Sequence, residues 1–275
     1  MEEATTAING VVSARLTKRA YQVCGTNRLV IAYDGQNRMR SDYTKLLIPV
    51  LALSFLAACE FDNATTGPMK EDHVTLDRGS VDRANVQLNM GAGQMDVSGG
   101  ASNLFDGTIQ YNVPAWQPVF THDVNGRHAS IELKQPEHVR LGGNAHYRWN
   151  LKLNDEVLLD LTANCGAGQA HFDIGQLKLR NVEVHMGAGQ VDLDLRGHPT
   201  RDYDVNVRGG VGQATIRLPD NVGIWAEAHG GLGSITVTGL NKGNGNQWQN
   251  DLYDKAKVNV RVTVEGGIGE IRIIA

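Results

Sequence analysis

Apolar and polar side chains alternate along most of the chain from His73 onward. Val182, Val184 and Met186, for example, take every second position of one segment. A period of two residues sends one set of side chains to each face of an extended strand, so the pattern predicts half-buried β-strands. No helical period of useful length follows Cys59. The alternation therefore predicts an all-β protein.

A Gly-x-Gly phrase recurs six times within this alternation and divides it into units. The copies that begin at residues 166, 187, 210 and 231 follow one another at steps of about 20 residues, a period typical of stacked β architectures. Paired glycines suit a corner or bulge, where the backbone takes positive φ or where two backbones approach closely. The sequence predicts a stacked, solenoid-like repeat. Its structural glycines are Gly91, Gly93, Gly166, Gly168, Gly187, Gly189, Gly210, Gly212, Gly231, Gly233, Gly267 and Gly269.

Two further columns follow from aligning the units on their glycines. The middle residue of the phrase grows in size along the chain, which predicts an interior column. The next column is mostly glutamine, which predicts a ladder of amide side chains between strands about 4.8 Å apart. A phosphate-binding loop is disfavoured, because such loops open a helix and none follows. The two columns are Ala92, Ala167, Ala188, Val211, Leu232, Ile268 and Gln94, Gln169, Gln190, Gln213, Ser234, Glu270.

The long interval between the first two phrases has a strand pattern of its own, with turn signals between the strands. We interpret it as a β-meander at the first end of the stack, and Asn241 to Lys255 as a surface loop between repeats. The meander contains most of the aromatic bulk, which predicts core packing, with an exposed ligand platform as the alternative. Its predicted strands are Thr108–Tyr111, Val119–His122, Ala129–Leu133, Arg148–Leu153 and Val157–Leu161, and its aromatic residues are Trp116, Phe120, Tyr147 and Trp149.

The apolar run from Leu46 to Ala58 predicts a secretory signal. It is too short to span a bilayer, and it has basic residues before it and small residues at its end. Leu56-Ala57-Ala58-Cys59 resembles the bacterial lipobox, which implies that Cys59 is acylated and becomes the new N-terminus. The alternative is a plain signal peptide cut near Ala58. We expect a lipid-anchored protein on the extracytoplasmic side of the cell envelope.

These signals predict five segments. Residues 1–38 are an extension that is non-native or unstructured, and residues 39–58 form the lipoprotein signal peptide. A polar tether follows at 59–72, then an N-terminal β subdomain at 73–160 and the Gly-x-Gly repeat domain at 161–275.

Composition narrows the choice of partners. The chain of 275 residues has a formal net charge of -4 and no basic tract, which disfavours nucleic acid as a partner. Its three cysteines are Cys24, Cys59 and Cys165. With Cys24 removed and Cys59 acylated, no intramolecular disulfide forms, so the fold depends on its core. No cofactor is expected.

A group of polar residues on the outward positions is the candidate for metal or acid–base chemistry. If the repeats stack in register, His171 lies beside Asp192, and Asp173 lies beside Asp194 near Arg217. Such a group could bind a divalent cation or act as a carboxylate pair in polysaccharide cleavage. The favoured interpretation is a solvated face on which Arg217 offsets stacked carboxylates. Neither Ser-His-Asp nor Cys-His spacing is evident, and Cys165 is expected to be packed.

The repeats resemble a known bacterial family. The segments Trp149–Leu153, Leu161–Gln169, Phe172–Leu179 and Val182–Leu195 are similar to the toast-rack family, which is related to LiaF-type cell-wall-antibiotic-response proteins and to adhesin-type domains. The resemblance implies a one-sided stack of strands with a separate N-terminal β subdomain. It implies no active site, so no functional residue is transferred.

We therefore expect a non-enzymatic, membrane-anchored envelope lipoprotein. Its stacked surface would serve protein interaction, scaffolding or envelope-stress sensing, with an unknown envelope protein or polymer as partner. The alternatives are an adhesin-like module that binds glycan or another envelope polymer and, more distantly, a β-solenoid enzyme that cleaves polysaccharide.

Overall fold

The computed structural model describes residues 66–136 and 144–275, which form one hydrogen-bonded sheet of 13 strands. Cys59, the predicted signal peptide and most of the predicted tether lie outside the described residues. Among the described residues, no helix has the length and apolar character needed to cross a membrane. The strands are β1 (Lys70–Leu76), β2 (Arg83–Ser98), β3 (Phe105–Tyr111), β4 (Val119–Asn125), β5 (His128–Lys134), β6 (Tyr147–Leu153), β7 (Leu158–Asp173), β8 (Lys178–Asp194), β9 (Tyr203–Arg217), β10 (Gly223–Thr238), β11 (Asn241–Lys242), β12 (Gln247–Gln249) and β13 (Asn259–Ile274), with a short 3₁₀ turn, η2, at Pro114–Trp116.

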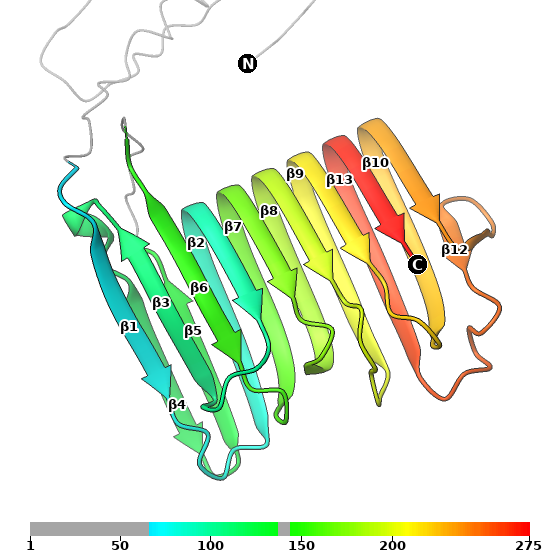
Figure 1. Cartoon of the computed structure of the whole chain (residues 1–275). Coiled ribbons are helices and arrows are strands. Elements are labelled where there is room, and N and C mark those ends of the chain that lie inside the picture. Colours follow the sequence, from blue (N-terminus) through cyan, green and yellow to red (C-terminus); the bar gives the residue numbers. More distant parts are fainter. Residues whose placement is uncertain (1–65, 137–143) are drawn as a thin grey trace, which may run out of the picture. The chain divides into compact units, whose positions relative to one another are not determined.

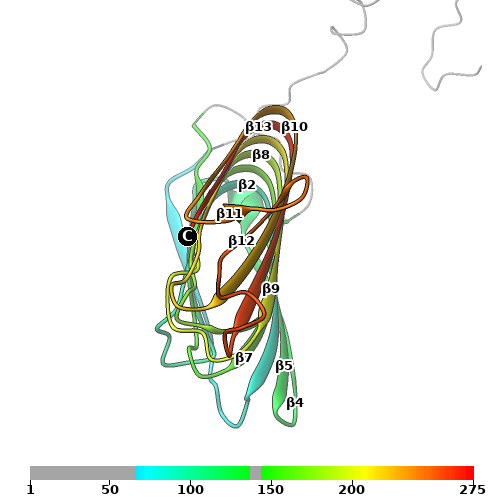
Figure 2. The ribbon, with the colours of Figure 1, turned by 90° about the vertical axis from the view of Figure 1, so that its right-hand side faces the viewer.

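Each of the six long strands is an arch that bends at its Gly-x-Gly. Figures 1 and 2 show these ribbons turning over along one edge of the molecule, so that every strand has two limbs that face each other. In β8 the buried positions are Val184 and Met186 before the glycines but Val191 and Leu193 after them, and this change of phase marks the bend. We call the part before the bend the first limb, the bend the apex and the part after it the second limb. The core lies between the limbs.

The arches stack in parallel and in register, as the repeat predicts. Gly168 of β7 pairs with Gly189 of β8, which pairs with Gly212 of β9. The second glycine of each phrase has strongly positive φ, for example 137° at Gly189. A Cβ atom on any of these glycines after the first would overlap the carbonyl oxygen of the preceding arch. Glycine is therefore required at the apex by both backbone conformation and backbone approach.

The arches do not stack in sequence order. The last strand, β13, lies between β9 and β10, and is parallel to both. The segment Asn241 to Lys255, expected to be a loop between repeats, instead forms β11 and β12 at the end of the sheet. Asn250 fixes it there, because its Oδ1 accepts the N–H of Ile224 at 2.9 Å and its Nδ2 donates to the carbonyl of Val222 at 2.7 Å.

The five strands predicted between the first two phrases are present, but their pairing differs from a simple meander. β5 pairs in parallel with the first limb of β2, and β6 pairs in parallel with its second limb. These two strands therefore continue the two limbs of the stack by one position. β3 and β4 form another, reversed arch that crosses at η2 and pairs antiparallel to β6 and β5. The β3–β4 connection, residues 112–118, contains no glycine, so this arch lacks the apex of the repeats.

The subdomain boundary expected between residues 160 and 161 falls inside β7. This strand pairs with β2 along its whole length, from Leu158 to Asp173. The sheet is thus continuous across the expected boundary.

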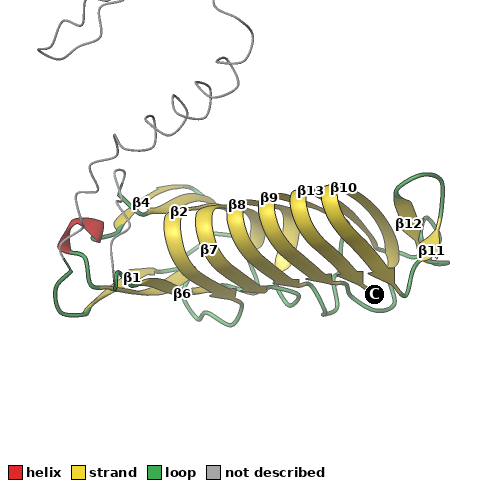
Figure 3. Cartoon of the chain, turned by 90° about the horizontal axis from the view of Figure 1, so that it is seen from above, coloured by secondary structure: helices red, strands yellow, loops and turns green. Residues whose placement is uncertain are grey.

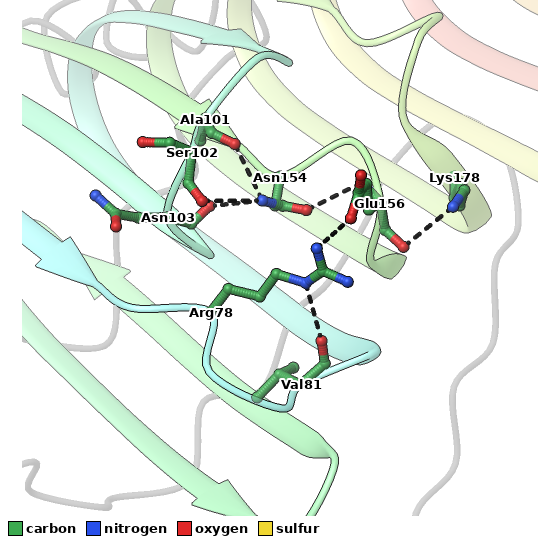
Figure 4. Close-up of polar contacts among 8 residues, drawn as sticks. All are labelled: Arg78, Val81, Ala101, Ser102, Asn103, Asn154, Glu156 and Lys178. Carbon is green, nitrogen blue, oxygen red and sulfur yellow. Dashed lines mark hydrogen bonds and ion pairs between the residues drawn. The ribbon is translucent and has the colours of Figure 1, made fainter.

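Asn154 joins two connections at the base of the sheet (Figure 4). Its Nδ2 donates to the carbonyls of Ala101 and Asn103, both at 3.0 Å, and lies 3.4 Å from that of Ser102. Its Oδ1 accepts the N–H of Glu156 at 3.0 Å. Asn154 is buried, so these bonds take the place of water for both loops.

Aromatic side chains of β3, β4, β6 and η2 fill the core at the first end of the stack. Tyr147 makes edge contacts with Tyr111, Trp116 and Trp149, with ring centroids 5.7 to 6.2 Å apart. All four residues are buried, and Phe120 is partly buried against the same core. They pack the core, as the sequence favours, and present no exposed aromatic platform.

Candidate functional site: the apex crest

The middle residues of the last three stacked phrases form an exposed aliphatic row. Val211, Ile268 and Leu232 are paired in register on β9, β13 and β10, and their exposed fractions are 52%, 51% and 71%. The increasing size of these residues along the chain predicted an interior column, and that prediction is wrong. The bend at each glycine pair puts the middle residue on the convex side of the arch, where it points away from the core. We call Val211, Ile268 and Leu232 the apex crest.

At the other end of the apex row, the middle residues of the phrases have small side chains, and the first of them is covered. Ala92 in the first of these arches is buried, and the Oε1 of Gln135 accepts the N–H groups of Gly91 and Ala92 at 2.8 and 3.0 Å. The sequence gives no sign of this role for Gln135, because its partners are backbone groups of a strand distant in sequence. Among the described residues of the apex row, the large exposed aliphatic side chains are those at the β10 end.

Below the apex, the residue that precedes each Gly-x-Gly has a sizeable side chain in the first three of these arches and none in the last three. Met90, Cys165 and Met186 fill this inward position on β2, β7 and β8, whereas β9, β13 and β10 have glycine there. Burial raises the pKa of the Cys165 thiol to about 11, so at neutral pH it is a packed, protonated group.

A partly open pocket of about 80 Å³ lies at the crest. It is lined mainly by glycines and aliphatic side chains of β8, β9, β13 and β10, together with Gln213, Ser234, Glu265 and Glu270. Ile271 and Ile235 extend into the space left by Gly266 and Gly230. In β9 the corresponding pair is Gly209 and Ala214, the smallest combination in the stack.

Replacing Ala214 with valine should raise the free energy of unfolding by about 1 kcal/mol, because the added methyl groups occupy existing space and gain apolar contacts. Valine already stands at the equivalent position of β8, Val191. Urea unfolding measures the change. Ala170→Val in β7 is the matched control, since Ala170 faces a filled apex and should lose stability through overpacking.

The outward rows of the second limbs have the predicted register. Gln94, Gln169, Gln190 and Gln213 are paired across four arches. Only the first pair makes an amide–amide hydrogen bond within the described segments, from Gln94 Nε2 to Gln169 Oε1 at 3.3 Å. The glutamines are therefore aligned, while their side chains remain exposed to solvent.

The acidic group predicted on this face is brought together, and most of its carboxylates pair with arginine. His171 Nδ1 lies 3.8 Å from Asp192 Oδ2, and Asp173 lies beside Asp194. Asp192 forms an ion pair with Arg217.

Asp194 is paired in the same way. The Nε of Arg196 donates to its Oδ1 at 2.9 Å, and this hydrogen bond lowers the pKa of Asp194 below its ordinary value. Across residues 66–136 and 144–275, no three His, Cys, Asp or Glu side chains are placed to hold a metal ion. The arrangement is that of a charge-balanced solvated face.

The fold and its apex define a class of protein: a stack of parallel β-arches with glycine apices, extended at its first end by shorter paired strands. The chain belongs to the toast-rack family, because the model described as "N-terminal domain of toast_rack, DUF2154" matches residues 65–217. A second model, "Cell wall-active antibiotics response LiaF, C-terminal", matches residues 167–273. No curated protein matches the chain.

One solved structure supports this assignment. A candidate cell adhesion protein from Clostridium sporogenes is 28% identical, with a TM-score of 0.70, and the match covers 75% of this chain and 99% of that one. A candidate adhesin from Bacteroides fragilis is 8% identical, with a TM-score of 0.30, and covers 75% and 97% of the two chains. The second likeness is too weak to support an argument.

Proposed function

We propose that this protein is a non-enzymatic, lipid-anchored module of the cell envelope that binds a partner protein through the apex crest. The exposed aliphatic row at the crest carries this proposal. Leu232, Ile268 and Val211 lie on neighbouring strands about 4.8 Å apart and form one contiguous patch. Scattered apolar side chains are ordinary on a protein surface, whereas a contiguous patch is typical of an interaction site.

The position of the crest agrees with a partner close to the membrane. β1 begins at Lys70, which pairs with Tyr111 near the apex, so the chain enters the sheet on the crest side. Cys59, the expected acylation site, is about ten residues earlier, a length that reaches at most about 35 Å. An anchored molecule would therefore hold its crest near the bilayer surface and near membrane proteins.

The other two hypotheses have less support. Glycan binding by the N-terminal aromatic residues needs exposed rings, but Trp116, Tyr147 and Trp149 are buried. Polysaccharide cleavage needs two available carboxyl groups, but Asp192 and Asp194 each pair with arginine. We therefore propose the interaction function alone.

Site-specific photocrosslinking in intact cells tests the proposal. A photoreactive amino acid at position 232 should give one discrete crosslinked protein, because a bound partner covers the crest. The same amino acid at Thr162, on the outer face of the first limb of β7, is the control and should give none. The triple change of Val211, Ile268 and Leu232 to serine should abolish capture detected from position 234 without lowering Tm. Crosslinking at position 232 to lipid alone would contradict the proposal.

A further inference from the structure

The second limb of β10 is an open edge of the sheet at the crest end (Figures 1 and 3). β13 pairs with one side of this limb, from Leu232 to Thr238, whereas β12 pairs only with the first limb, at Trp225–Glu227. The hairpin of β11 and β12 extends the first-limb layer beyond β10. No described strand extends the second-limb layer in the same way, so the outer side of this limb is uncovered.

Two residues of the limb have backbone groups that point to the open side. In a parallel ladder, neighbouring residues direct their N–H and C=O groups to opposite sides of the strand. The carbonyl of Thr238 accepts the N–H of Ala275 at 3.0 Å, so the backbone groups of Thr238 and Thr236 point toward β13. Those of Ile235 and Val237 point the other way, and they have no backbone partner within the described chain.

The limb also lacks the usual protection of an edge strand. Exposed edges are ordinarily blunted by charge, proline or a covering segment. Leu232 to Thr238 contains no charged residue and no proline, whereas the second limbs of β2, β7, β8, β9 and β13 each contain a charged residue. The inward side chains of Ile235 and Val237 are only partly buried, and so is Trp248 in the inward row of β12. A strand added here would cover apolar surface that the fold leaves open.

We propose that the partner held at the crest adds one extended segment of its chain to this edge, as a strand beside Leu232–Thr238. The inference rests on the function proposed above, because Leu232 is both the most exposed residue of the crest and the first residue of the edge. A partner that covers the crest therefore lies next to the open backbone groups. In strand addition, main-chain hydrogen bonds supply affinity and alternate side chains supply specificity.

The edge indicates the chemistry of the added segment. Its inward residues would lie beside Ile235 and Val237 and should be aliphatic, because a polar group there would be buried without a partner. Its outward residues would lie beside Ser234 and Thr236 and should be small or β-branched polar residues, which pair well across strands. The edge offers no charge to pair with one on the segment. The proposed ligand is thus an uncharged, alternately aliphatic stretch of an envelope protein.

A second copy of this chain fits the edge poorly. At the other end of the sheet, the free strands β1 and β4 place Asp72 and His122 in their inward rows, where the neighbour of Ile235 should be apolar. Antiparallel pairing of two β10 edges would bring the second limbs about 4.8 Å apart. The β11–β12 hairpins, which extend beyond β10 in the other layer, would then overlap. These features favour a segment of another protein.

Hydrogen exchange of the full chain, in native membranes and after purification in detergent, tests strand addition. In the purified protein, the amides of Ile235 and Val237 should exchange freely. Those of Ser234 and Thr236 are bonded to β13, so they should be protected in both samples and serve as the internal control. In membranes, all four amides should be protected, because the added strand bonds the outward pair. Mass spectrometry of a peptic fragment of the second limb measures the two additional retained hydrogens.

A proline on the edge gives a second test. Val237→Pro removes an outward N–H and leaves the ladder with β13 intact, so capture of the partner from position 232 should fall about tenfold. Val237→Ala is the matched control, because it trims the same side chain, keeps the N–H and should retain capture. The exchange measurement uses the unaltered chain, so it stands even if the proline variant has a lowered Tm.

The outcomes separate this inference from the function on which it rests. Capture from position 232 without protection of Ile235 and Val237 would overturn strand addition and leave the interaction at the crest standing. Loss of both capture and protection would refute the proposed function, and strand addition with it. Equal capture in Val237→Pro and Val237→Ala, at equal Tm, would also overturn strand addition. So would a photocrosslinked dimer of this chain obtained from position 236, because the occupant would then be a second copy.

Discussion

Replacing Gly189 with alanine should lower the free energy of unfolding by about 4 kcal/mol or more, enough to unfold many domains of this size. Gly189 has a φ of 137°, which side chains rarely adopt, and its added Cβ would overlap the carbonyl oxygen of Gly168 in the preceding arch. The overlapping atoms belong to two backbones held by the same ladder, so neither can move aside alone. Urea unfolding followed by circular dichroism measures the loss.

Gly209→Ala is the matched control for this prediction. Gly209 lies near the apex of the next arch, has no positive φ, and its added Cβ would come no nearer than 3.9 Å to another group, the carbonyl of Glu265. This change should leave stability unchanged or raise it by about 0.5 to 1 kcal/mol, because alanine reduces the entropy of the unfolded chain. The requirement for glycine is expected at Gly189 and not at Gly209. Equal losses of stability in Gly189→Ala and Gly209→Ala would contradict this.

Replacing Asn154 with aspartate should be the second large loss, of about 3 kcal/mol at pH 7. The Nδ2 group of Asn154 donates to carbonyl oxygens of the Ala101–Asn103 loop (Figure 4). A carboxylate offers these oxygens no proton and adds a negative charge at a buried position. The two loops would lose their link, so thermal unfolding should shift to lower temperature.

The loss in Asn154→Asp should depend on pH. Burial and the facing carbonyls favour the protonated carboxyl group, so its folded-state pKa is raised above the ordinary value of about 4. The variant should therefore be closest to the natural protein below pH 4 and should weaken relative to it as pH rises through the raised pKa. Asn154→Ala, which removes the bonds without adding charge, is the control and should show no such dependence. A pH-independent loss in the aspartate variant would contradict the assigned contacts.

The local structure was largely predictable because each signal is short in range. Alternation defined the strands, including those between the first two phrases, and the glycine spacing defined the register in which Gln94 pairs with Gln169. The pairing of His171 with Asp192 followed from the same register. These features depend on neighbouring positions in one repeat and on the repetition itself.

The candidate site was less predictable, because it depends on which way an apex faces. Val211 and Leu232 are aliphatic residues between glycines, and their composition alone indicated an interior column. Only the bend of the arch, with the core confined between the limbs, turns these side chains toward solvent. The ends of the stack are likewise set by pairing between distant segments, such as β12 with β10.

The sequence by itself determined the all-β class, the stacked repeat, the need for glycine at each phrase and the register of the outward rows. The tertiary structure decided the order of the arches, the insertion of β13 between β9 and β10, the pairing of β3 to β6 at the first end and the exposure of the crest. The physical reason lies in the range of the interactions. Strand periodicity and glycine conformation act within a few residues, whereas strand order and the choice of exposed face result from burying one shared core between limbs far apart in sequence.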